Sequence, residues 1–145
     1  WMLDPVSRRL SAAELGGGAW SDGERIKTGS ISPGPAELVG AIGRFMPPEI
    51  ERDVTARAAR LPGLVPNMKC AGVEYPRIAA GERHFAYYWR TLAWDHAPGV
   101  LFLNEAGGKA TRPDGSDYVP GSAGSGLLAA HNAAIWETAH RLLVA

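Results

Sequence analysis

The chain has 145 residues, enough for one ordinary domain with its own hydrophobic core. Its 15 basic and 15 acidic residues cancel and form no run of like charges, which argues against binding to nucleic acid or an anionic membrane and leaves a small molecule as the expected partner. Cys70 is the only cysteine and no apolar stretch approaches the roughly 20 residues of a membrane span, so we exclude an internal disulfide and a thiolate zinc cluster and expect a soluble, cytoplasmic protein.

The first third of the chain is predicted to be mostly β-structure. Residues 1–3 and 9–15 can pair across the turn-forming segment DPVSR, and Asp22-Gly23 then sends another short strand back. Residues 28–36 are predicted to be a loop because they are rich in Gly, Ser and Pro. Residues 37–45 then offer a short apolar strand.

Two helices are predicted in the middle of the chain. The first lies between the prolines at 47–48 and Pro62-Gly63, and its apolar residues recur at helical spacing: Ile50, Val54, Ala58 and Leu61. The arginines fall on the opposite face, which is typical of an amphipathic surface helix. The second helix is expected to start near Val73, because Pro76 is best tolerated in a first turn, and to end at Gly81.

The last part of the chain alternates strands and helices. Residues 84–89 form an aromatic strand, residues 95–106 an apolar helix that Gly107-Gly108 ends, and residues 126–131 a buried strand, with an Asp114-Gly115 turn before it. Asn132 can cap the closing helix, whose inward stripe is Ile135, Trp136, Ala139, Leu142 and Leu143. The alternation predicts a layered α/β domain in which helices cover a mixed sheet.

Asp95 is a polar residue at the start of an otherwise apolar helix. Asp is a favoured N-cap residue, so a capping role is one interpretation. The other is a metal ligand, because a strand-to-helix junction of an α/β sheet commonly forms a ligand crevice and magnesium prefers carboxylate oxygens. The residue types alone leave both interpretations open.

The segment WDHAPGVLFLNEAGG, residues 94–108, resembles the carboxyl-terminal signature of the inositol monophosphatase family, in which Trp-Asp, a pair of small residues and an apolar helix precede Glu-Ala-Gly-Gly. The matching residues occur in the same order: Trp94, Asp95, Gly99, Glu105, Ala106, Gly107 and Gly108. LDPVSRRLSAAELGGGAWSDGERI, CAGVEYPRIAAGERHFAYY and GLLAAHN are similar to further parts of this family. The likeness spans most of the chain.

This resemblance implies that residues 1–145 are the carboxyl-terminal domain of a larger phosphatase. Family members carry a glutamate and an Asp-Pro-x-Asp-Gly-Thr motif in an amino-terminal half that supplies most metal ligands, whereas the only Asp-Pro here, at Asp4, continues as Val-Ser-Arg. By resemblance the whole enzyme is a homodimer that hydrolyses a phosphate monoester with two or three Mg²⁺ ions, and the isolated chain is expected to be inactive. Asp95 would bind one Mg²⁺ and help to position the water that protonates the leaving oxygen; Glu105 would be structural, and His96 would face away from the site.

The resemblance also implies where substrate would bind: Ala71, Gly72, Tyr88 and Arg90. Ala71 and Gly72 align with small residues that let substrate hydroxyls approach the backbone, although they equally fit a turn before a helix. Tyr88 replaces a glutamate that binds a sugar hydroxyl in inositol phosphatases. Trp89 and Arg90 could form an aromatic wall and an anion-binding fork for a second anion or a planar group, or could simply end a strand with the ring in the core and Arg90 in solvent.

The function expected from this resemblance is Mg²⁺-dependent hydrolysis of inositol phosphate or of a related small sugar, polyol or nucleotide phosphate. The partners would be this small phosphorylated substrate, the amino-terminal half of the same enzyme and a second copy in a homodimer. The alternative is a non-catalytic domain that binds a phosphorylated ligand or serves for dimerisation.

Overall fold

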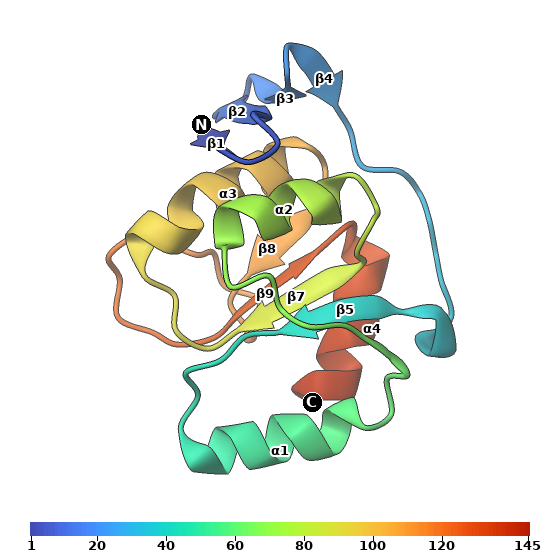
Figure 1. Cartoon of the computed structure of the whole chain (residues 1–145). Coiled ribbons are helices and arrows are strands. Elements are labelled where there is room, and N and C mark those ends of the chain that lie inside the picture. The colour runs from blue at the N-terminus through green and yellow to red at the C-terminus, as the bar shows by residue number, and fades with distance from the viewer.

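The computed structural model describes all 145 residues as two β-sheets and four α-helices in alternating layers (Figure 1). The first sheet is an antiparallel meander of β1 (Met2–Leu3), β2 (Leu10–Glu14), β3 (Gly18–Ser21) and β4 (Glu24–Ile26). The turn between β3 and β4 places Asp22 and Gly23 at φ angles of 51° and 85°, which is why an Asp-Gly pair occurs there. The strand pairing predicted for the first third is therefore confirmed.

The second sheet is mixed, as predicted. Its strands are β5 (Val39–Ile42), β6 (Gly63–Leu64), β7 (Phe85–Tyr88), β8 (Lys109–Thr111) and β9 (Leu127–Ala130), in the order β6-β5-β7-β9-β8. β5 is parallel to β6 and β7, whereas β9 is antiparallel to β7 and β8. β8 was not predicted, because its three residues lie among turn-forming Gly and Pro residues and only pairing with β9 makes them a strand.

The helices cover both faces of the second sheet. They are α1 (Pro48–Ala58), α2 (Ala71–Ala79), α3 (Ala93–Glu105) and α4 (Ala133–Leu143), and a 3₁₀ turn η1 (Pro35–Glu37) precedes β5. α2 and α3 lie between the two sheets, while α1 and α4 lie on the opposite side of the second sheet (Figure 1). No helix is both long and apolar enough to cross a bilayer.

The two faces of β7 belong to two different parts of the core. Ala86 and Tyr88 pack in the cluster beneath α2 and α3, whereas Phe85 and Tyr87 pack in the cluster against α1 and α4. This separation follows from the alternation of side chains along a strand. Any two neighbouring residues at the end of β7 are therefore directed to opposite sides of the sheet.

The predicted starts of α2 and α3 were wrong. α2 begins at Ala71 rather than near Val73, and α3 begins two residues before Asp95. Neither helix has a side-chain cap: their N-cap residues are Cys70 and Leu92, both with extended backbone. The capping interpretation of Asp95 is thus wrong, because Asp95 is the third residue of α3. By contrast, the cap predicted for α4 is confirmed by a 2.9 Å bond from the Ile135 N–H to the Asn132 side chain.

Glu105 joins the end of α3 to the first sheet. Its Oε1 accepts from the Gly16 N–H at 2.8 Å and its Oε2 from the Gly18 N–H at 2.9 Å. The geometry agrees with the structural role predicted for this residue. The two bonds fix the β2–β3 turn against the helix end.

We expect Glu105→Gln to lower the free energy of unfolding by about 1–2 kcal/mol, because the amide keeps one acceptor and turns a donor toward the other glycine N–H. Chemical denaturation would measure the change. Glu14→Gln, on an exposed strand residue of the same hairpin, is the control and should be neutral. Equal stability of both variants would contradict the assigned role.

Candidate active site

A cavity of about 690 Å³ opens at the carboxyl ends of β5 and β7. Its walls come from the first residues of β1, the loop after β5, the loop before α2, and the first turns of α2 and α3. Because β5 and β7 are parallel, both strands end at the same edge of the sheet, where helices that follow begin. This is the position at which α/β sheets commonly bind ligands, and the helix N-termini there favour anions.

All five site residues predicted from the sequence line this cavity: Ala71, Gly72, Tyr88, Arg90 and Asp95. Ala71 and Gly72 form the first turn of α2, and no heavy atom of another segment lies within 4 Å of the position that a Cβ would occupy at Gly72. Arg90 is exposed and lies over the Phe45 ring, with its Cζ 3.9 Å from the ring centroid. The fold thus brings together residues that are up to 24 positions apart in the chain (95 − 71).

Asp95 presents a free carboxylate to this cavity. The side chain is exposed and makes no hydrogen bond or salt bridge with another residue. The backbone is held by a 3.1 Å bond from its N–H to the Leu92 carbonyl, in the first turn of α3. The positive end of the helix dipole favours a negative charge at this point. The carboxylate is therefore available to a ligand or a cation.

Tyr88 and His96 form the buried wall of the cavity. The Tyr75 hydroxyl is 3.0 Å from Nδ1 of His96, and the Tyr88 ring lies 4.6 Å from the His96 ring, centroid to centroid. Burial raises the pKa of Tyr88 well above its usual value. Burial also lowers the pKa of His96, and the nearby Asp95 charge partly offsets this lowering. Both side chains are consequently neutral near pH 7. His96 is 4% exposed and lines the cavity, so the prediction that it faces away was wrong.

Two buried polar atoms of the cavity wall have no hydrogen-bond partner: the Tyr88 hydroxyl and Nδ2 of Asn67. Asn67 uses its Oδ1 to accept from the Lys69 N–H at 2.8 Å, which leaves its amide group free. Buried polar groups are nearly always paired, so each such group calls for an explanation. Within this chain neither atom has a hydrogen-bond partner, although both residues line the cavity.

The residues of this cavity that sequence reasoning missed include Arg44, Phe45, Asn67 and Lys69. Arg44 and Phe45 fell inside the strand predicted for residues 37–45, whereas β5 ends at Ile42 and leaves both residues in the loop that follows it. The ends of parallel strands gather ligand-binding residues, but which strands are parallel neighbours is not visible locally. Only the pairing of Ile42 with Tyr87 brings the segment after β5 beside that after β7.

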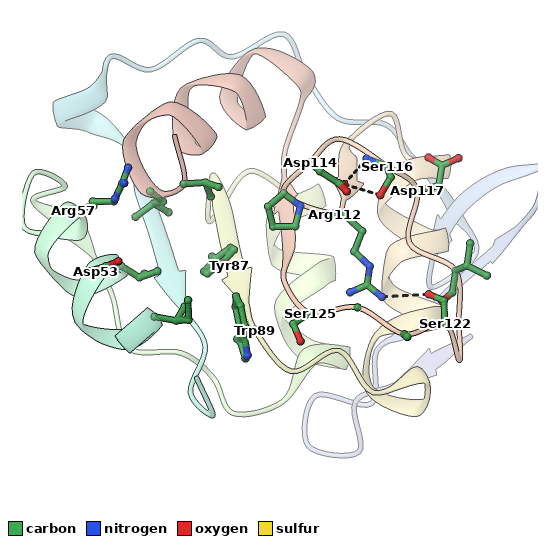
Figure 2. A pocket seen from close by; sticks show the side chains of 18 residues that line it. Asp53, Arg57, Tyr87, Trp89, Arg112, Asp114, Ser116, Asp117, Ser122 and Ser125 are labelled. Carbon is green, nitrogen blue, oxygen red and sulfur yellow. Dashed lines mark hydrogen bonds between the residues drawn. The ribbon is translucent and has the colours of Figure 1, made fainter. Parts of the chain in front are cut away.

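Of the two alternatives for Trp89, the structure supports the ring in the core and not the aromatic wall, because Trp89 packs on the other face of the sheet, where it lines a second cavity. Figure 2 shows this cavity, of about 620 Å³, between Asp53 and Arg57 of α1 and the loop that follows β8. Its buried cation, Arg112, already donates to Oγ1 of Thr91 at 2.8 Å and to a backbone carbonyl at 2.9 Å. The residues whose buried polar atoms lack a hydrogen-bond partner do not line this second cavity.

The carboxylate of Asp95 fits a hard cation, but this chain does not form a complete metal site. Mg²⁺ is commonly held by one or two carboxylates, waters and substrate phosphate. Asp95 is the only carboxylate in the cavity, and nowhere does the chain gather three His, Cys, Asp or Glu residues that could hold a metal ion. The chain can therefore contribute one ligand to a metal, and further ligands would have to come from elsewhere.

Comparison with known proteins places the chain in a family. The sequence profile of the Inositol monophosphatase family matches residues 1–145. The chain is 33% identical over 113 residues to the fructose-1,6-bisphosphatase/inositol-1-monophosphatase of Thermotoga maritima, covering 78% of this chain and 43% of the relative. It is 30% identical over 119 residues to the inositol-1-monophosphatase of Rhizobium meliloti, covering 79% of this chain and 44% of the relative.

The fold also resembles that of solved proteins. The structure of the extragenic suppressor protein suhB from Bartonella henselae superposes with a TM-score of 0.83 at 23% identity, covering 98% of this chain and 54% of that chain. The chain thus spans less than half the length of the two curated relatives it matches and about half of the solved protein. Since the family profile matches the whole chain, the protein belongs to the inositol monophosphatase family.

Proposed function

We propose that this chain is the carboxyl-terminal domain of a Mg²⁺-dependent phosphatase that hydrolyses a small phosphate monoester. The single observation that carries the proposal is the free Asp95 carboxylate in a cavity that the start of the Trp94–Gly108 family segment helps to line. The relatives named above support phosphatase chemistry, and each is about twice as long as this chain. An amino-terminal half would supply the remaining ligands.

The residues of this half would position the substrate and the ion. Asp95 would hold one Mg²⁺, which when bound polarises phosphoryl oxygens and lowers the pKa of a coordinated water. The small residues Ala71 and Gly72 would let the substrate approach the backbone at the start of α2. The neutral Tyr88 hydroxyl, which lacks a partner, would hydrogen-bond a substrate hydroxyl where inositol phosphatases use a glutamate.

The proposed partners are the substrate, the amino-terminal half and a second copy of the protein. A homodimer is expected from the family resemblance, and a cytoplasmic location from the single cysteine. The proposed substrate is an inositol phosphate or a related small sugar, polyol or nucleotide phosphate.

The test is phosphate release by the protein expressed from its complete reading frame, with Mg²⁺ and with excess EDTA. We expect turnover of at least one of inositol 1-phosphate, fructose 1,6-bisphosphate and adenosine 3′,5′-bisphosphate, abolished by EDTA and restored by Mg²⁺. Calcium in place of magnesium, with the same substrates, is the control for simple charge neutralisation. Tight binding without turnover would instead establish a non-catalytic phospholigand-binding protein, and turnover that resists EDTA would refute the metal dependence.

A further inference from the structure

The candidate cavity is lined by more cationic side chains than carboxylates. Arg44, Lys69 and Arg90 line it, and Asp95 is its only carboxylate. None of the three cations forms a salt bridge, and none donates a side-chain hydrogen bond within the chain. Exposed cations without partners are common on protein surfaces, but three around one cavity produce a local field that attracts anions.

Two of these cations are placed together by the sheet. Ile42 of β5 pairs with Tyr87 of β7, and the Gly43 N–H continues the pairing with a 2.7 Å bond to the Tyr87 carbonyl. Arg44 and Arg90 therefore follow neighbouring parallel strands at the same sheet edge. Both side chains line the candidate cavity at this edge, and we call Arg44 and Arg90 its cationic rim.

Phe45 orients one of them. The Arg90 guanidinium lies 3.9 Å from the centroid of the Phe45 ring, which is 69% exposed. A guanidinium stacked on a ring keeps its in-plane N–H donors free, and these match the paired oxygens of a phosphate or a carboxylate. The Phe45 ring thereby serves as a platform for Arg90.

The backbone at this rim is strained. Phe45 and Lys69 have φ angles of 68° and 58°, and they are two of only four non-glycine residues in the left-handed region. For a bulky aromatic residue this conformation is unusual, and such residues concentrate at ligand sites. The strain places the Phe45 ring under Arg90 and the Lys69 backbone against Asn67.

We infer that Arg44 and Arg90, with Phe45 beneath Arg90, form a subsite for a second anionic group of the substrate. The inference rests on the proposed function, in which the scissile phosphate would lie near Asp95 and a Mg²⁺ ion held there would balance its charge. The cationic rim then serves a different group, and the substrate class is a phosphate monoester that carries a further phosphate or carboxylate. Lys69 adds to the attraction without a fixed geometry.

The test compares matched substrates in the complete protein. Fructose 1,6-bisphosphate is paired with fructose 6-phosphate, and 3-phosphoglycerate with glycerol 3-phosphate, so one pair adds a phosphate and the other a carboxylate. We expect a KM lower by about 10- to 100-fold for the member of a pair that carries the second anion. The double variant Arg44→Gln/Arg90→Gln should remove this preference, so that the KM values of the two members of a pair become equal within about twofold.

Arg52→Gln, on the exposed face of α1, is the matched control and should keep the preference. Binding of the same compounds, measured by titration calorimetry without Mg²⁺, gives a readout that needs no turnover. Equal KM values and equal affinities within both pairs would overturn the subsite while leaving the phosphatase proposal intact. Preferential binding of the doubly anionic compounds with no hydrolysis of any compound would support the subsite and refute the phosphatase proposal.

Discussion

Asp95→Asn is expected to reduce Mg²⁺-dependent phosphate release by the complete protein at least about 100-fold. Asparagine keeps the size and one oxygen of the side chain but loses the charge that a hard cation requires. Replacing residues that merely support metal ligands already costs about 10- to 100-fold, so loss of a ligand should cost no less. The measurement is kcat/KM at several Mg²⁺ concentrations, where the variant should also need more Mg²⁺ for half-maximal rate.

Folding should be unaffected by this substitution. The Asp95 side chain has no partner within the chain, so the free energy of unfolding should change by less than about 0.5 kcal/mol. Asp53→Asn, an exposed carboxylate on the opposite side of the second sheet, is the matched control and should retain full activity. Wild-type activity and Mg²⁺ dependence in the Asp95 variant would show that this carboxylate is not a metal ligand.

Glu74→Gln is expected to lower the free energy of unfolding by about 3–5 kcal/mol. Glu74 is 1% exposed; its Oε1 pairs with Arg83, which is 9% exposed, and its Oε2 accepts from the Met68 N–H at 3.1 Å. The amide would leave a buried guanidinium without its counter-charge. Such an uncompensated charge costs more than the pair itself contributes.

The same substitution should loosen the loop that carries Asn67 and Lys69, because Glu74 holds the neighbouring Met68 N–H. Chemical denaturation of the complete protein measures the loss of stability, and the KM for substrate reports the loop. Glu82→Gln is the matched control, since the Glu82–Arg77 pair is 3.7 Å long and exposed and should change stability by less than about 0.5 kcal/mol. If Glu74→Gln and Glu82→Gln lowered the free energy of unfolding equally, the buried Glu74–Arg83 pair would not stabilise the fold as predicted.

Local signals were sufficient for much of this fold. Asp22-Gly23 specifies a tight turn, Asn132 caps α4, and Gly81 and Gly107 end α2 and α3 with φ angles of 77° and 95°. These features depend on the dihedral preferences and short-range bonds of a few neighbouring residues, which any stretch of sequence reveals. Asp95 was likewise singled out by its position within a family segment.

The starts of α2 and α3 could not be predicted in the same way. Each begins after an extended residue without a capping side chain, Cys70 or Leu92, so the boundary depends on how the helix packs. Close packing between the two helices is visible at Gly99, where a Cβ would lie 2.1 Å from the Tyr75 ring. A contact of this kind involves residues 24 positions apart (99 − 75) and leaves no local signal.

Which residues line the candidate cavity was also decided by the tertiary structure. Tyr88 and Trp89 are neighbours in the chain, yet the sheet directs them to cavities on opposite faces. Arg44 and Arg90 share a rim only because β5 and β7 are parallel and in register. Residue types and short spacings identify candidate ligands, but the pairing of distant strands decides which of them meet, because that pairing is stabilised by core contacts spread over the whole chain.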